Sequence, residues 1–196
     1  MGNNNTVFLL VGQRGAGKSI YAEKLAKAYP TVGVVSRDEI LMRRFGSVSF
    51  DNYSGHGVLE YVQGVIFRLL RMKLRNSSGV RLILDHWTFT GEERKTIIHK
   101  LHNCVASKVV ALYFVTPVEA VNEWFWKKPK IAKMNQMNTL RGLGFTFFSE
   151  NAPANDHRVF HSFADGVDSD GFDEVIRVNP LETITPEIEL AFNSLQ

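Results

Sequence analysis

The residues best suited to chemistry lie in one short stretch, GQRGAGKS, directly after the apolar run VFLLV. Glycines let a loop bring its backbone N–H groups close to a phosphate chain, and a following helix directs its positive end at the anion. The pattern Gly-x4-Gly-Lys-Ser therefore predicts binding of ATP, with the lysine on the β- and γ-phosphates and the serine on Mg²⁺. Lys18 is a candidate catalytic residue, expected to point into solvent without ligand, and Ser19 is the candidate metal ligand. The predicted cofactor-binding residues are Gly12, Gln13, Arg14, Gly15, Ala16, Gly17, Lys18 and Ser19.

Two aspartates follow other predicted strands, at the point where each strand ends. Asp38 lies in VVSRDEI and Asp85 ends LILD. Transfer of a phosphoryl group needs a carboxylate near the acceptor hydroxyl, and ligands of parallel sheets bind at the carboxyl ends of the strands. We therefore interpret both aspartates as candidate catalytic residues. The alternatives are a first-turn helix position for Asp38, capped by Ser36, and for Asp85 the end of a strand or support of Mg²⁺ through water.

Short apolar runs alternate with helical patterns along the chain. Continuous apolar strands that alternate with helices indicate a parallel sheet covered on both faces, so the predicted class is α/β. The capping-box sequences TGEE and TPVE begin two further helices, and TPEIELAFNSL begins the last one. The expected strands cover residues 6–11, 32–35, 80–84, 109–115 and 174–178, and two more helices cover 18–29 and 57–75.

Composition sets the broad class of the protein. A chain of 196 residues, 44% hydrophobic and 22% charged, suits one domain over residues 1–196, with a small lid expected within 124–160. The single cysteine, Cys104, offers no internal disulfide and suits a reducing compartment. No apolar run approaches the ~20 residues that span a bilayer. We expect a cytoplasmic protein.

Other proteins with such a loop fit the sequence less well. A signalling GTPase needs Asp-x-x-Gly after the third strand and an Asn-Lys-x-Asp motif, whereas here the third strand ends in DHWT and the chain has no Asn-Lys pair. AAA-type motors need a larger module with an attached helical domain. Of the classes of protein with such a loop, the sequence therefore favours an enzyme that transfers a phosphoryl group to a bound acceptor.

Four segments, GQRGAGKS, SRDEI, LILDHWTFTGEERK and DGFDEVIRV, resemble the P-loop kinases typified by the 5′-hydroxyl polynucleotide kinase of bacteriophages and by related predicted ATP-dependent kinases. The resemblance implies a three-layer P-loop NTPase fold of kinase type, with a mostly parallel sheet flanked by helices and a small lid. It also implies that Lys18 and Ser19 bind ATP and Mg²⁺, that Asp38 is the general base and that Asp85 helps to place the acceptor. Arg94 matches a frequent arginine of that family.

The chain also departs from this family. Leu41 stands where the phage kinases have an arginine, His86-Trp87 replaces a small polar dipeptide, and the expected lid arginine has no clear match. Lysines of the segment 127–133, Arg141 or Arg158 are the alternatives for that cation. The candidate substrate-binding residues are Arg37, Arg43, Arg94, Lys127, Lys128 and Arg141.

Two basic clusters bear on the acceptor. Arg68, Arg71 and Arg75 share one face of a predicted helix, and the lysines 127–133 follow Trp124 and Trp126. Cations beside aromatic rings suit a single nucleic-acid strand, although a solvated helix face with core tryptophans gives the same pattern.

The favoured function is an ATP-dependent kinase whose acceptor is the 5′-hydroxyl of a polynucleotide. One alternative is a kinase of a small hydroxyl compound such as a nucleoside, nucleotide or sugar, with DNYSGHG in the acceptor pocket. Another is a nucleotide-binding regulatory protein that hydrolyses slowly. The expected partners are ATP and either a nucleic-acid 5′ end or a small hydroxyl acceptor, with no membrane.

Overall fold

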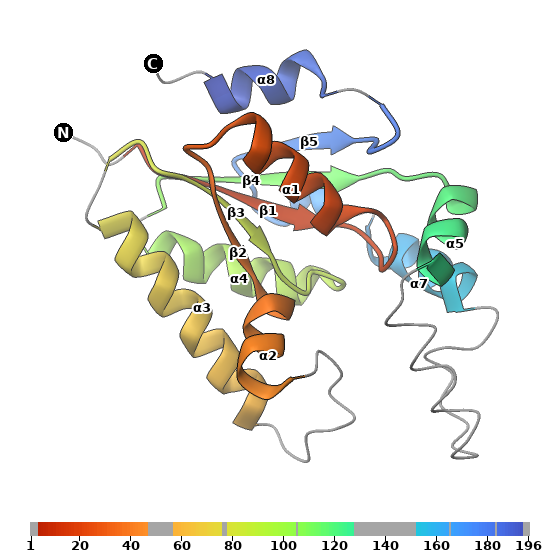
Figure 1. The fold of residues 1–196 in the computed structure, drawn as a ribbon, viewed down its shortest axis with the longest axis horizontal. Coiled ribbons are helices and arrows are strands. Elements are labelled where there is room, and N and C mark those ends of the chain that lie inside the picture. Colours follow the sequence, from red (N-terminus) through yellow and green to blue (C-terminus); the bar gives the residue numbers. More distant parts are fainter. Residues whose placement is uncertain are drawn as a thin grey trace.

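A five-stranded parallel sheet forms the centre of the molecule (Figure 1). The structure is a computed structural model that describes residues 4–46, 57–75, 78–104, 106–127, 152–164, 166–182 and 184–193. The strands lie in the order β2-β3-β1-β4-β5. Each predicted strand is confirmed, with its bounds within one residue of the prediction. They are β1 Thr6–Val11, β2 Gly33–Ser36, β3 Arg81–Asp85, β4 Lys108–Phe114 and β5 Glu174–Val178.

Helices cover both faces of this sheet (Figure 1). α1 (Lys18–Ala28) and α8 (Pro186–Asn193) lie on one face, and α3 (Gly57–Arg75) and α4 (Gly91–Asn103) lie on the other. α2 (Arg37–Phe45) follows β2 directly, while α5 (Val118–Lys127) and α7 (Ala152–Ala164) lie side by side beyond the carboxyl ends of the strands. A 3₁₀ turn, η3 (Val167–Ser169), precedes β5. The three layers confirm the predicted fold class.

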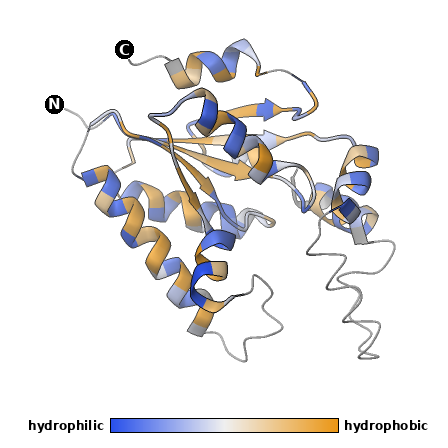
Figure 2. Cartoon of the chain, viewed as in Figure 1, coloured by the Kyte–Doolittle hydropathy of each residue, from blue (hydrophilic) through white to orange (hydrophobic). Residues whose placement is uncertain are grey.

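Strand β1 is buried on both of its faces. Val7, Leu9 and Val11 pack toward α3 and α4, whereas Phe8 and Leu10 pack toward α1 and α8. Both sets are apolar because successive side chains of a strand point to opposite faces and helices cover each face. In Figure 2 the central strands are largely hydrophobic, whereas the helices carry both hydrophobic and hydrophilic residues. The loop after β1 therefore starts from a rigid central strand.

Local signals at the helix starts are partly confirmed. The capping box of Thr90 and Glu93 is present at α4, and Ser36 caps α2 by accepting from the backbone N–H of Glu39 at 3.4 Å. Thr116 was expected to cap α5. The contact that the structure shows for its hydroxyl is a bond donated to the carbonyl of Ala16, at 2.8 Å, which ties the glycine-rich loop to the segment after β4.

The expected lid falls largely outside the described residues. Residues 124–127 form the last turn of α5 and residues 152–160 belong to α7. Lys128 and Arg141 lie outside the described part of the chain, as does the segment DNYSGHG except for its final glycine. In the portions that the structure describes, we find no helix with the length and apolar character needed to span a membrane.

Candidate active site

The glycine-rich loop joins β1 to α1 in a conformation suited to an anion. Gly15 and Gly17 have φ angles of 82° and 85°, in the left-handed region that other residues rarely adopt. A Cβ on Gly17 would also lie 2.9 Å from the ring of Trp124. Gly17 is the N-cap of α1, and neither a side-chain cap nor an acidic first-turn residue is present at this helix end. The positive end of α1 is therefore left to interact with a bound phosphate.

Lys18 closes over this loop. Its Nζ donates to the carbonyl oxygens of Gly12 at 2.7 Å and Gln13 at 2.8 Å. The expectation that the side chain points into solvent is wrong, because these two carbonyls accept from the ammonium group. The ammonium is already held above the loop, where phosphate oxygens can replace the carbonyls as acceptors.

Ser19 and Asp85 meet at the edge of the sheet. The hydroxyl of Ser19 donates to Oδ2 of Asp85 at 2.7 Å. Asp85 ends β3, which pairs directly with β1 with Leu84 opposite Leu9, so the two strands bring both side chains to the same edge. A hydroxyl and a carboxylate are oxygen donors of the kind that Mg²⁺ takes. The pair fits a magnesium site, and this contact favours the metal-side interpretation of Asp85 over a direct role toward the acceptor.

Asp38 lies in the first turn of α2, directly after the neighbouring strand β2. Ser36 pairs with Asp85 in the register of β2 and β3, so the first turn of α2 starts beside the end of β3. Arg37 donates to Oδ1 of Asp38 through Nε at 3.2 Å and Nη2 at 2.9 Å. The Arg37 side chain is 14% exposed, whereas that of Asp38 is 55% exposed. The Arg37 guanidinium thus orients the carboxylate of Asp38, which stays exposed.

The loop after β3 brings the rings of His86 and Trp87 to the site. In the sequence these two residues stood out only as departures from the family. The guanidinium of Arg37 lies over the ring of Trp87, 5.6 Å from its centroid. His86 is 8% exposed, and its Nδ1 lies 3.0 Å from the carbonyl of Trp87. Burial lowers the pKa of His86, and the Arg37 cation acts in the same direction, so the ring is neutral at pH 7. Within the described residues its buried Nε2 has no hydrogen-bond partner.

Helix α7 contacts the phosphate loop, which the sequence did not indicate. Arg14 donates to both carboxylate oxygens of Asp156, at 2.6 and 2.8 Å. The side-chain oxygen of Gln13 accepts from Nδ1 of His157 at 2.9 Å. Burial lowers the pKa of His157, and His161 lowers it further. Because the partners are more than 140 positions apart in the chain, no local pattern could have revealed these contacts.

The candidate substrate-binding cations are not gathered in one place. Arg94 was expected to contact substrate, but its side chain is fully buried and ion-paired with Asp170. This expectation is corrected: Arg94 shares the inner face of α4 with Ile97, Ile98 and Leu101, which could have been read from the helical spacing. Arg43 and Lys127 are exposed and pair with acidic residues of their own helices.

The first basic cluster extends away from the loop. Arg68, Arg71 and Arg75 are exposed on α3. Since α3 leads into the amino end of β3, its last turn lies at the edge of the sheet opposite the glycine-rich loop (Figure 1). In the second cluster, Trp124 packs against Gly17 of the loop. Of the lysines in residues 127–133, Lys127 alone belongs to the part of the chain that the structure describes.

The sheet order, the glycine-rich loop after β1 and the carboxylate at the end of the adjacent strand define the class of P-loop kinase folds, as the resemblance implied. The family described as AAA domain (AAA_33) matches residues 7–141, and the chain belongs to this family. Although the family is described as an AAA domain, the fold of this chain is of the P-loop kinase type.

Solved structures show the same fold. A chain of the Pnkp1/Rnl/Hen1 RNA repair complex is similar with a TM-score of 0.61 and 17% identity over 84% of this chain. Shikimate kinase from Acinetobacter baumannii, in complex with shikimate, is similar with a TM-score of 0.54 and 17% identity over 97% of this chain and 90% of that chain. The present chain spans 47% of the chain from the RNA repair complex, about half its length. Among curated protein sequences, none matches this chain.

Proposed function

We propose that this protein is an ATP-dependent phosphotransferase that moves the γ-phosphoryl group of ATP to a hydroxyl acceptor. One observation carries the proposal. The phosphate loop, the contact of Ser19 with Asp85 and the exposed carboxylate of Asp38 lie at the carboxyl ends of three adjacent strands, β1, β3 and β2. This is the edge of a parallel sheet where ligands bind.

The nucleotide side of the site positions the phosphates. The backbone N–H groups of the loop and the N-terminus of α1 bind the phosphate chain, and Lys18 donates to its β- and γ-oxygens. Ser19 and Asp85 would hold Mg²⁺, which when bound neutralises charge on the transferred group. Gln13 and Arg14 keep the loop attached to α7 through their side chains.

The acceptor side of the site handles the proton. Asp38 accepts the proton of the acceptor hydroxyl as its oxygen bonds to the γ-phosphorus and the bond from that phosphorus to the β–γ bridging oxygen breaks. Both contacts of Arg37 fall on Oδ1 of Asp38, so we assign Oδ2 as the oxygen that takes the proton. The position of this base also argues against a regulatory protein that only hydrolyses slowly.

The acceptor that we propose is the 5′-hydroxyl of a polynucleotide, with residues 124–160 as the lid. The resemblance of four sequence segments to polynucleotide kinases supports it, and so does the likeness of fold to a chain of an RNA repair complex. A small hydroxyl compound is the second candidate. The direction of the basic cluster on α3 favours this alternative, since the cluster extends away from Asp38.

The test is transfer of label from γ-labelled ATP with Mg²⁺ to 5′-hydroxyl DNA, 5′-hydroxyl RNA, nucleosides and sugars. Oligonucleotides that already carry a 5′-phosphate are the substrate control. Lys18→Ala is the inactive control, and Lys27→Ala, an exposed lysine of the same helix, is its matched variant. We expect label on the 5′-hydroxyl oligonucleotides only. Label on a nucleoside or sugar alone would favour the second candidate, and hydrolysis without transfer to any acceptor would contradict the proposal.

A further inference from the structure

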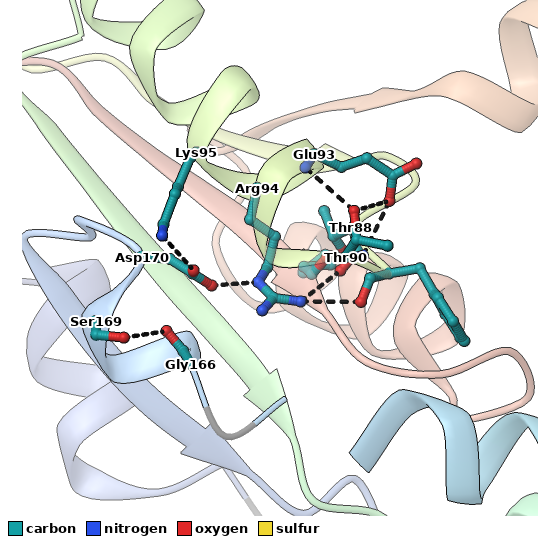
Figure 3. Close-up of polar contacts among 10 residues, drawn as sticks. Thr88, Thr90, Glu93, Arg94, Lys95, Gly166, Ser169 and Asp170 are labelled. Atoms are coloured by element: carbon teal, nitrogen blue, oxygen red, sulfur yellow. Dashed lines mark hydrogen bonds and ion pairs between the residues drawn. The ribbon is translucent and has the colours of Figure 1, made fainter. Parts of the chain in front are cut away.

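An ion pair is buried behind the acceptor side of the site. Arg94, from the first turn of α4, is 0% exposed and Asp170, which follows η3, is 6% exposed. Nε of Arg94 lies 2.5 Å from Oδ2 of Asp170 (Figure 3). Such pairs are weak stabilisers, because removing two charges from water costs much of what their attraction returns. Stability alone therefore does not account for this pair.

The same guanidinium holds the loop that follows β3. Nη1 of Arg94 donates to the carbonyl oxygens of Thr88 at 3.2 Å and Phe89 at 3.0 Å (Figure 3). The hydroxyl of Thr88 donates in turn to the carbonyl of Leu10 in β1, at 2.9 Å. A planar fork with five donors can serve one carboxylate and two carbonyls together, whereas a lysine ammonium lacks this geometry.

That loop supports the candidate base. Trp87 lies in the chain between Asp85 and the two anchored residues, Thr88 and Phe89. Its ring stacks against that of Phe89, with the centroids 5.6 Å apart. The guanidinium of Arg37 lies over the Trp87 ring, 5.6 Å from its centroid. Arg37 holds Asp38 through two hydrogen bonds. A continuous series of contacts thus leads from Asp170 through Arg94, the loop and Arg37 to Asp38.

We propose that Arg94 and Asp170 are positioning residues for the acceptor side, which hold residues 86–90 so that Trp87 supports Arg37 and thereby Asp38. As a statement about catalysis, this inference rests on the proposed function. As a statement about the loop, it can be tested without any substrate.

The first test uses Trp87 as a reporter of the loop. The chain has three tryptophans, so Trp124→Phe with Trp126→Phe leaves Trp87 alone. In this background we expect Arg94→Lys and Asp170→Asn to shift Trp87 emission to the red and to increase its quenching by acrylamide. Lys95→Met is the matched control, since Lys95 is exposed and lies 3.9 Å from Oδ1 of Asp170. Unchanged emission and quenching in folded variants would overturn the proposal, and so would loss of cooperative folding in both, because the pair would then serve the core.

The second test separates positioning from a purely structural role. With the acceptor found in the labelling experiment, we expect Arg94→Lys to lower kcat per nucleotide-binding site by about tenfold to a hundredfold, the cost of a small misplacement. Affinity for a fluorescent ATP analogue stays that of the parent. Unchanged kcat with lower thermal stability would overturn the positioning role. If no acceptor is labelled, the proposed function fails. The Trp87 test still shows whether Arg94 and Asp170 hold residues 86–90 in place.

Discussion

The nucleotide side and the acceptor side of this site are built in different ways. The nucleotide side consists of consecutive residues, Gly12 to Ser19, that leave a buried strand and enter a helix. The acceptor side combines the start of α2, the loop after β3 and a buried ion pair that reaches to Asp170. Phosphate binding can be encoded in one short motif because backbone N–H groups supply it, whereas a base and its support need side chains from separate segments.

We expect a substitution of Asp38 to separate the two sides of the site most clearly, because it affects transfer and not the phosphate loop. Asp38→Asn removes the proton acceptor but leaves the loop intact, so we expect transfer to fall on the order of 10²- to 10⁴-fold. The measurement is the initial rate of label transfer. Glu39→Gln, which changes the next acidic residue of the same helix turn, is the control and retains the parental rate. Similar losses in both variants would mean that the helix start, and not the base, is what matters.

Lys18 tests the nucleotide side. Removing one preorganised cation at the transferred group costs about 10²- to 10³-fold in similar settings, and we expect this loss of transfer for Lys18→Ala. The same variant also loses the two bonds that close the loop over Gly12 and Gln13. Rates are compared with those of Lys27→Ala. Full activity of Lys18→Ala would remove the interpretation of the loop as a phosphate site.

The attachment of the loop to α7 is tested by the pair Arg14 and Asp156. Their side chains are 25% and 16% exposed, so solvent screens the attraction in part. A double-mutant cycle with Arg14→Met and Asp156→Asn is expected to give a coupling of about 1 kcal/mol in the free energy of unfolding. The measurement is urea unfolding of the four proteins. Strictly additive losses would show that the two residues do not support each other in solution.

The smallest effect concerns pH. Because burial lowers the pKa of His157, the unfolded chain binds more protons than the folded one as pH falls below the ordinary value near 6.5. This contribution to stability is complete above that value and is lost as the pH falls toward the lowered pKa. His157→Asn is therefore expected to lose less stability between pH 7 and acid conditions than the parent does. Thermal unfolding at a series of pH values measures the difference, with His99→Asn on α4 as the control.

Sequence patterns predicted the structural elements that are determined by residues close together in the chain. The strands, the capping box of Thr90 and the glycine-rich loop follow from local chemistry, and the rule for the edge of a parallel sheet placed Asp38 and Asp85 together. Arg94 was expected to contact substrate, because charged residues are rarely buried, but its side chain lies in the core. Its partner Asp170 is 76 positions away, and a contact at that distance is a property of the tertiary fold.

The division between the two sides is tested most directly by titrating a fluorescent ATP analogue, with Mg²⁺, into the parent, Lys18→Ala and Asp38→Asn under the same conditions. We expect parental affinity for Asp38→Asn, although this variant no longer transfers phosphate, and strongly weakened binding for Lys18→Ala. Weakened binding by Asp38→Asn together with parental binding by Lys18→Ala would contradict this expectation, because the nucleotide would then be held by the side that we assign to the acceptor.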